Sequence, residues 1–286
     1  MAAGEDVWDL GELLAPVAKD SAEVRYALIL LNTPIPHDYW RAFIRLWRRA
    51  DLRICADGAA NRLLDSVGSG AWTEMPLPSI ICGDLDSVRE DVRDFFEEKG
   101  VEVVHRPSLY ATDLQKCVHS LEDIEEAGSP EYELVIFGGL GGRLDQTMHT
   151  LHVLWQLAPN VPVGEIIPEP EEPGKAPPRG SHLRKRARTL VVSENCVTCL
   201  LSAGEHDLRH NRKILGKSCG VLPLGSGPPG ARVHTQGLEW NLEDDPSFLG
   251  GFFSSNNHLA PDNAEGMVHI GADAPVYWTV ELKRDP

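Results

Sequence analysis

Hydrophobic residues in the first half of the chain form short continuous runs, separated by segments with helical spacing. The runs are Tyr26–Leu31, Leu52–Ala56, Ser79–Cys82, Val101–His105 and Glu133–Phe137. Apolar runs of this length, bounded by Gly, Pro or Asp, predict buried parallel strands. Between them, aromatic and aliphatic residues recur at helical spacing, as in His37–Arg49. Strands that alternate with helices predict an α/β domain with a mostly parallel sheet.

From Thr189 onward the pattern changes to short strands between turn residues, and no long helical pattern is present. The expected strands are 189–193, 196–201, 219–224, 233–236, 251–254, 267–270 and 276–282. Gly, Pro, Asn and Asp between them mark the turns. This pattern predicts that an all-β sandwich domain follows the α/β domain. The expected organisation is an N-terminal tail (1–23), the α/β domain (24–158), an insert or linker (159–188) and the β-sandwich (189–286).

The insert is rich in proline and acidic residues, and it ends in the basic run Arg184–Arg188. Such composition predicts a mobile loop or linker. A basic run of this kind is also compatible with a nuclear signal. A solvated loop is the preferred interpretation, because nothing else in the sequence indicates the nucleus.

Composition and charge narrow the range of functions. The chain has 286 residues, with 43 Asp and Glu against 27 Lys and Arg, which gives a net charge of −16. This acidity argues against a non-specific nucleic-acid surface, although a metal or a local basic group can still bridge to phosphorylated ligands. No apolar run is long enough for a membrane span, and the acidic start does not resemble a signal peptide. We expect a cytoplasmic protein that binds neither nucleic acid nor membrane.

Six cysteines are scattered through the sequence, several of them within apolar runs. Cys196 and Cys199 form a C-x-x-C pair, but no second pair or histidine cluster completes a zinc site around it. The pair is therefore expected to lie on a strand, and the cysteines to be reduced.

Carboxylates follow several of the predicted strands. Asp57 follows the second strand, Asp84 and Asp86 follow the third, and Asp113 opens a helix with Lys116 one turn later. The carboxyl ends of parallel strands form the ligand crevice of an open α/β sheet, and Mg²⁺ prefers carboxylate and phosphate oxygens. The alternatives are local: Asp57, Thr112 or Asp113 would each serve as a helix N-cap.

A glycine-rich segment, Gly138–Gln146, lies between the fifth strand and the next helix. Its glycines suit a loop that approaches phosphate, with Arg143 as the anion partner. Its glycine spacing fits neither a Walker A motif nor a dinucleotide fingerprint.

Taken together, six segments resemble the thiamine pyrophosphokinase family, and its fungal members in particular. They are Ala56–Arg62, Cys82–Ser87, Thr112–Cys117, Gly138–Gln146, Thr235–Leu242 and Ser254–Asn256, in the family's order. The resemblance covers about Tyr26 to Lys283, apart from the insert. It implies an α/β catalytic domain and a thiamine-binding β-sandwich, assembled as a homodimer with active sites at the subunit interface. The implied reaction transfers the pyrophosphoryl group of ATP to the hydroxyl of thiamine, gives AMP and requires Mg²⁺.

The resemblance also assigns residues by position. Asp84, Asp86 and Asp113 match the catalytic, metal-organising acids. Asp57, Asn61, Thr112, Lys116 and Arg143 match positions near the nucleotide. The positions expected near the substrates are Asp145, Trp240, Ser255 and Asn256. A Trp face suits cationic thiamine on cation–π grounds, although a Trp in a β-sandwich is also a common core residue.

The sequence departs from the family pattern before the Thr112–Asp113 pair, where Ser108 and Leu109 replace a more polar run. Leu109 has no polar side-chain atom, so one substrate contact is in question. This departure motivates a second hypothesis, a catalytically silent protein that binds nucleotide and thiamine. A third is a haloacid-dehalogenase-type phosphatase with Asp84 as covalent nucleophile, since the segment 84–88 fits its D-x-D-x-[TV] pattern. That motif normally ends the first strand of its domain, whereas two strand–helix units precede it here.

Overall fold

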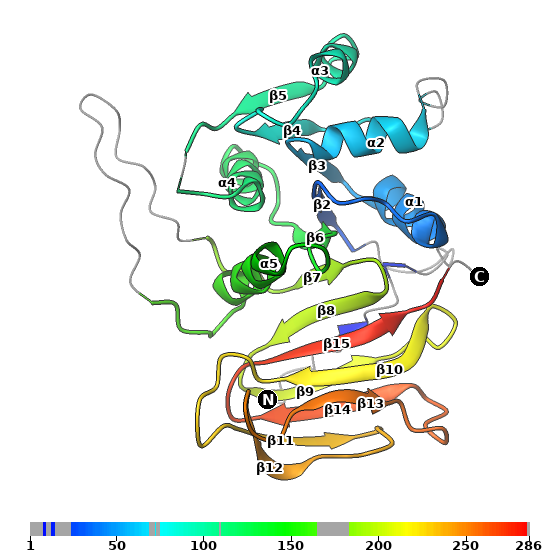
Figure 1. The fold of residues 1–286 in the computed structure, drawn as a ribbon, viewed down its shortest axis with the longest axis vertical. Coiled ribbons are helices and arrows are strands. Elements are labelled where there is room, and N and C mark those ends of the chain that lie inside the picture. The colour runs from blue at the N-terminus through cyan, green and yellow to red at the C-terminus, as the bar shows by residue number, and fades with distance from the viewer. Residues whose placement is uncertain are drawn as a thin grey trace.

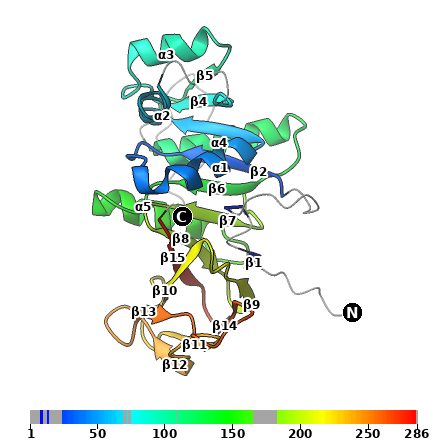
Figure 2. The ribbon, with the colours of Figure 1, turned by 90° about the vertical axis from the view of Figure 1, so that its right-hand side faces the viewer.

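The computed structural model describes residues 8–9, 13–14, 24–68, 72, 75–108, 110–164 and 183–284. Its helices and strands form an α/β part and a β part that share one long sheet (Figure 1). In Figure 2 the α/β part occupies the upper half of the molecule and the two sheets of the β part lie below it.

Six strands of the long sheet are parallel. In spatial order they are β7 (Thr189–Val192), β6 (Glu133–Phe137), β2 (Tyr26–Leu30), β3 (Leu52–Ala56), β4 (Ile80–Gly83) and β5 (Glu102–His105). Their residues alternate between two apolar clusters, as the two covered faces of a parallel sheet require. Leu28 and Leu30 face one cluster, and Ala27 and Ile29 face the other.

Helices cover both faces of this parallel half. The helices α1 (Trp40–Arg49), α2 (Ala59–Val67) and α3 (Glu90–Glu97) pack into the first cluster, and a short 3₁₀ helix, η1 (His37–Tyr39), precedes α1. The helices α4 (Asp113–Glu126) and α5 (Leu144–Leu157) pack into the second. The predicted α/β domain with a mostly parallel sheet is confirmed, and its helices form one layer on each face.

The long sheet continues into the β part without a break. Antiparallel strands extend it beyond β7 in the order β8 (Cys196–Leu201), β15 (Val276–Leu282), β10 (Leu215–Leu222) and β13 (Ser254–His258). A second sheet is formed by β1 (Trp8–Asp9), β9 (Gly204–Arg209), β14 (Met267–Ala272), β11 (Ala231–Gln236) and β12 (Glu243–Ser247). Apolar residues of both sheets belong to one cluster, which confirms the predicted β-sandwich.

Some elements differ from the expectations. The strands β9 and β12 are not predicted by hydropathy because they are mostly polar, and Leu208 and Ser247 are their only buried residues. The strand expected at 251–254 is wrong in position, since β13 spans Ser254–His258. Cys196 and Cys199 lie on β8, as predicted.

The basic run is not the solvated loop that its composition predicts. Arg186 is 1% exposed, and its guanidinium donates to both carboxylate oxygens of Glu125 on α4, at 2.8 and 3.1 Å. It also donates to the backbone carbonyl oxygen of Tyr132 at 3.1 Å. A buried charge is tolerated when it is paired with an opposite charge, so this ion pair fixes the end of the insert against the α/β part. Within this guanidinium, only Nε of Arg186 has no hydrogen-bond partner among the described residues. No helix among the described residues is long and apolar enough to cross a membrane.

Candidate functional site

Three carboxylates meet at the carboxyl ends of β3 and β4. Asp57 follows β3, Asp84 follows β4, and Asp113 is the first residue of α4. One oxygen from each lies within 4.8 Å of the others. The two strands are parallel neighbours, so their ends meet at one edge of the sheet, where open α/β sheets bind their ligands.

Gly83 makes the close approach of these carboxylates possible. A Cβ atom at this position would lie 2.6 Å from Cβ of Asp57 and 3.2 Å from Oδ1 of Asp113. Any side chain here would therefore enter the space between the acids. Glycine is therefore required at this position for steric reasons, and not only because it ends the strand.

Lys116 is the basic partner of the cluster. Its ammonium donates to Asp84 Oδ2 at 2.7 Å and to Asp113 Oδ1 at 3.1 Å, and its side chain is 3% exposed. Burial alone would lower the pKa of Lys116, but the bonds to the two carboxylates outweigh it and raise that pKa. The hydrogen bond from Lys116 also lowers the pKa of Asp84. The predicted pairing of Asp113 with Lys116 on one face of the helix is confirmed.

Asp57 is buried, and its backbone has a positive φ of 45°. Its carboxylate accepts hydrogen bonds from the backbone amides of Ser87 and Val88, at 3.2 and 3.0 Å, so it holds the turn that follows β4. Burial raises the pKa of Asp57 to about 6, helped by the nearby Asp113 and Asp84. The N-cap interpretation of Asp57 is wrong: the N-cap of α2 is Gly58, without a side-chain cap.

Asn61 fixes the same turn from α2. Its amide nitrogen donates to the backbone carbonyl oxygen of Ser87 at 2.8 Å, and its side-chain oxygen accepts from the amide of Arg89 at 3.0 Å. Asp86 lies on this turn but outside the three-carboxylate group. It is exposed, and it accepts a bond from the Ser87 hydroxyl at 2.8 Å.

Thr112 is the N-cap of α4 and forms a reciprocal capping box with Gln115. Its hydroxyl also lies 2.7 Å from Nε2 of His149 on α5. Burial, with a contribution from His152, lowers the pKa of His149, so its ring is neutral near pH 7. Sequence reasoning missed His149, because a lone histidine on a helix gives no signal of its own.

The glycine-rich segment forms an exposed loop before α5. Gly138, Gly139 and Gly142 have positive φ values, which explains the choice of glycine. Arg143 and Asp145 form an ion pair with each other at the start of α5, and both are largely exposed. They are not bonded to the acidic cluster in the residues that the structure describes. Leu109 lies outside the described residues.

The residues predicted to contact thiamine lie elsewhere: two are on the outermost strand of the long sheet, and Trp240 is beside it, between β11 and β12. Ser255 and Asn256 are exposed on β13. Buried Asn257 on that strand bonds both the backbone amide and the carbonyl oxygen of Trp240, at 3.2 and 2.6 Å. Trp240 is 53% exposed and its ring lies 5.1 Å from that of His258, so it is not a core residue.

The fold and the acidic cluster define a class of protein. An α/β sheet with paired acids, a buried lysine and a glycine-rich loop at its carboxyl edge is typical of proteins that handle phosphorylated ligands with a divalent metal. A β-sandwich with an exposed aromatic platform adds a second recognition surface.

Comparison with known proteins identifies the family. Residues 43–163 match the thiamin pyrophosphokinase catalytic domain, and residues 205–277 match its vitamin B1 binding domain. Thiamine pyrophosphokinase 1 of Oryza sativa is 32% identical over 94% of this chain and 91% of its own length. Thiamine pyrophosphokinase 1 of Arabidopsis thaliana is 30% identical over 95% and 91%. The chain belongs to the thiamine pyrophosphokinase family, which sets aside the dehalogenase interpretation of Asp84.

Solved structures agree on the fold. The thiamin pyrophosphokinase from Candida albicans superimposes with a TM-score of 0.75, covering 99% of this chain and 95% of its own, at 20% identity. The yeast enzyme gives a TM-score of 0.72 over 96% and 90%, at 24% identity.

Proposed function

We propose that the cluster of Asp57, Asp84, Asp113 and Lys116 binds the triphosphate of ATP through Mg²⁺. The chain is an ATP:thiamine diphosphotransferase, which moves the pyrophosphoryl group of ATP to the hydroxyl of thiamine and yields thiamine diphosphate and AMP. The observation that carries the site assignment is the convergence of three carboxylates and one buried ammonium at the carboxyl edge of the parallel sheet.

The donor set fits Mg²⁺. The cluster offers carboxylate oxygens only, which are the ligands this ion prefers, and a nucleotide's phosphates and water complete its shell. Three carboxylates face one ammonium, so the ionised cluster lacks positive charge, and the raised pKa of Asp57 reflects this deficit together with burial. When bound, the ion neutralises charge on the transferred phosphate.

The remaining residues have positioning roles. Phosphoryl transfer depends mainly on alignment and charge stabilisation, so rigid placement of the acids matters. Asn61 and Asp57 hold the turn that carries Asp84 and Asp86. Thr112 caps the helix that carries Asp113 and Lys116. Arg143 and Asp145, on the exposed glycine-rich loop, are proposed to separate from each other and contact the substrates.

We further propose a homodimer whose active sites combine the acidic cluster of one subunit with the Trp240 surface of the other. In the long sheet β4 is eight strand spacings from β13, or roughly 40 Å at about 4.8 Å per spacing. The acidic cluster and the Trp240 surface therefore lie far apart along the sheet of one chain, which supports a site completed by a second subunit.

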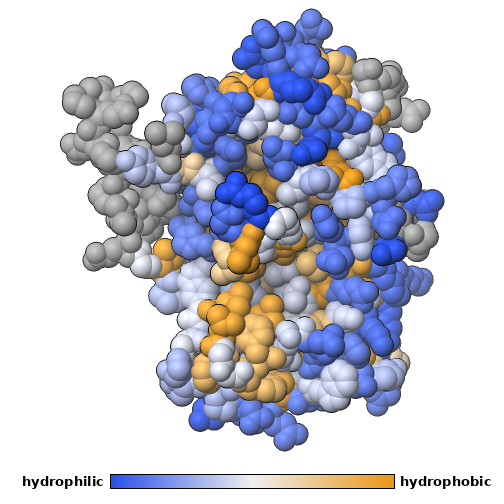
Figure 3. Space-filling view, in the orientation of Figure 1, coloured by the Kyte–Doolittle hydropathy of each residue, from blue (hydrophilic) through white to orange (hydrophobic). Residues whose placement is uncertain are grey.

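Exposed apolar surface supports this assembly. Trp240, Leu249 and Phe252 are all at least half exposed in the β part. Figure 3 shows apolar side chains gathered over the lower half of the visible face, where the antiparallel strands lie. Contiguous apolar surface of this kind is typical of interaction sites.

The domain limits 24–158 and 189–286 and a cytoplasmic location remain part of this proposal.

Product analysis tests the site. Parent protein incubated with ATP, Mg²⁺ and thiamine should release AMP and thiamine diphosphate in equal amounts. Asp84→Asn should lower the rate at least ~100-fold, as expected when one preorganised charge-stabilising group is removed. Asp94→Asn, on the exposed face of α3, is the matched control and should retain full activity.

The alternatives give different products. ADP or free phosphate would contradict the diphosphotransferase reaction. Thiamine-dependent thermal stabilisation without any AMP would favour the silent binding protein. Full activity of Asp84→Asn would contradict the site assignment. Comparing the Mg²⁺ dependence of Asp57→Asn with that of Asp86→Asn tells which acid completes the metal site, because only loss of a ligand should raise the Mg²⁺ concentration needed.

A further inference from the structure

A second cluster of metal-type ligands lies on the five-stranded sheet, away from the acidic strand ends. Oε2 of Glu205 on β9 is 3.1 Å from Nε2 of His234 on β11 and 2.9 Å from Nε2 of His269 on β14. All three ligand atoms lie within 4.8 Å of one another. The strands are neighbours in the order β9, β14 and β11, so the three side chains come from adjacent ladder positions.

The register of the sheet explains this convergence. Gly271 on β14 pairs with Glu205 on one side and with His234 on the other. A Cβ atom on Gly271 would lie 2.1 Å from Cε1 of His234 and 2.3 Å from Oε2 of Glu205. The missing side chain leaves the space in which the two groups meet. His269 lies two residues before Gly271 and therefore projects from the same face.

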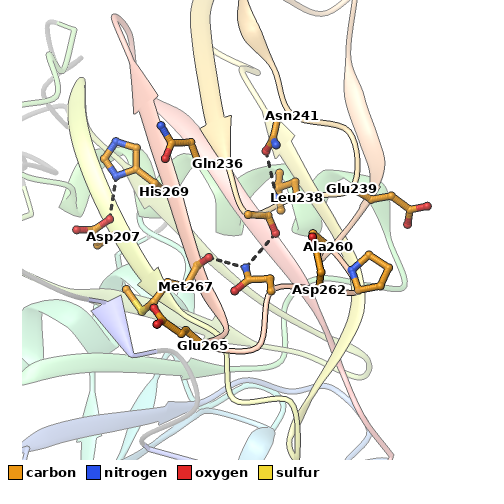
Figure 4. A pocket seen from close by; sticks show the side chains of 13 residues that line it. Asp207, Gln236, Leu238, Glu239, Asn241, Ala260, Asp262, Glu265, Met267 and His269 are labelled. Carbon is orange, nitrogen blue, oxygen red and sulfur yellow. Dashed lines mark hydrogen bonds and ion pairs between the residues drawn. The ribbon is translucent and has the colours of Figure 1, made fainter.

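Each histidine ring has a second carboxylate on its other nitrogen. Nδ1 of His269 is 2.8 Å from Oδ1 of Asp207, and Nδ1 of His234 is 3.3 Å from Oδ1 of Asp244. Figure 4 shows His269 and Asp207 with this bond drawn. A carboxylate that fixes Nδ1–H and leaves Nε2 for the ion is the usual environment of a metal-bound histidine.

Counting protons shows what the cluster lacks. A neutral imidazole has one N–H, and an ionised carboxylate has none to donate. Both rings face carboxylate oxygens at both nitrogens, so a neutral ring bonded to its Asp would point a bare lone pair at Glu205. The arrangement is satisfied either by a second proton on each ring or by one cation held between both Nε2 atoms and Glu205.

We propose that Glu205, His234 and His269 form a binding site for a divalent transition metal, with Zn²⁺ as the best fit. Two imidazoles and one carboxylate form a ligand set that zinc sites use, and three protein ligands leave a coordination position for water. Imidazole ligands distinguish this cluster from the all-oxygen Mg²⁺ site. The three side chains are about one-third to three-fifths exposed, and His269 and Asp207 also line an open cavity of about 860 Å³. An ion therefore has access from solvent.

Metal titration of the full chain tests the site. Protein freed of metal by chelation is titrated with Zn²⁺ in competition with a chromophoric chelator. The parent should hold one tightly bound Zn²⁺ per chain. His234→Ala and His269→Ala should each weaken this binding at least ~100-fold, because loss of a direct ligand costs more than the 10–100-fold typical of an outer-shell partner. Asp207→Asn, an outer-shell change, should fall within that smaller range.

Two controls identify the site. His206→Ala removes the histidine next to Glu205, whose Nε2 bonds the Ser202 carbonyl oxygen, and should leave the Zn²⁺ affinity unchanged. Asp84→Asn should also leave it unchanged, which separates the proposed site from the acidic cluster. X-ray absorption of the zinc-loaded parent should show nitrogen and oxygen ligands only.

Three results would overturn the proposal. One is equal Zn²⁺ affinity in the parent and in a His234→Ala/His269→Ala double variant. The second is sulfur ligation in the absorption spectrum. The third is a parent that binds no Zn²⁺ while its His234 and His269 imidazoles carry two protons each at neutral pH, because the cluster would then be held together by protons alone. The variants are at the surface, and their circular dichroism melting curves verify folding independently.

Discussion

The proposed sharing of each active site between two subunits can be tested by a subunit-mixing experiment. Asp84→Asn disables the acidic cluster, and Trp240→Ala removes the aromatic surface of the β part. If each site combines one surface from each subunit, a heterodimer of the two variants has one site with both lesions and one site with none. If each site is built from one chain, every site in that heterodimer carries one lesion.

The expected activities differ widely. A desolvated cation–π contact contributes about 2 kcal/mol, so Trp240→Ala should leave about 3% of the parental rate at low thiamine concentration. With shared sites, the heterodimer should recover about half of the parental activity per dimer. With separate sites it should give roughly 2%, the mean of about 3% and an inactive subunit.

The two chains are expressed together with different affinity tags, and the heterodimer is purified over both columns. The reciprocal heterodimer is the matched control: one chain carries both substitutions and the other carries none. Shared sites predict roughly 2% for this control, and separate sites predict about half. A control that is the more active of the two heterodimers, or a parent that is monomeric in solution, would refute the shared site.

Two further predictions concern stability. Glu125→Gln should lower the free energy of unfolding by about 3–5 kcal/mol in urea denaturation, because it leaves Arg186 buried without its counter-ion. Glu126→Gln, which affects a surface ion pair, should cost less than about 1 kcal/mol, and equal losses would contradict the assigned burial. The pKa of Asp57 is about 6 in the folded state, above its ordinary value of 3.8. Between pH 3.8 and pH 6 the folded chain therefore binds more protons at Asp57 than the unfolded chain does. The free energy of unfolding that Asp57 contributes falls as the pH rises through this range. In the presence of EDTA, the free energy of unfolding of the parent should fall by about 3 kcal/mol relative to that of Asp57→Asn between pH 3.5 and 7. A difference in unfolding free energy that stays constant over this range would contradict the raised pKa.

The α/β part could be predicted closely because its sequence pattern and its structure have the same cause. Strands covered on both faces are largely apolar, so β2 and β4 are visible as continuous apolar runs. The acids that follow such runs must lie at one edge of the sheet. Topology placed Asp84 and Asp86 at a strand end, whereas only the family resemblance joined them with Asp113 and Lys116. The structure shows Lys116 in contact with Asp84 and Asp113, and it leaves Asp86 outside the three-carboxylate group.

The β part was less predictable because its outer surfaces carry no such pattern. The strand β9 has one buried residue, and β12 is a polar edge strand. Hydropathy gives no signal for such strands, so Glu205 was not placed on a strand at all. The histidine cluster depends on pairing between three strands that are distant in sequence, with Gly271 at its centre. Spacing along the chain cannot reveal a site of this kind.

Asp57 shows why local rules can mislead at a functional site. An Asp between a strand and a helix is ordinarily read as an N-cap, since that position satisfies free helix amides. Here its carboxylate instead binds the amides of Ser87 and Val88, across the sheet edge, in a backbone conformation with positive φ. A helix cap needs neither the burial that raises the pKa of Asp57 nor the strained backbone conformation of this residue. The burial and the backbone strain of Asp57 are explained if it serves to fix the turn that carries Asp84, so the departure from the local rule is itself a signal of the proposed site.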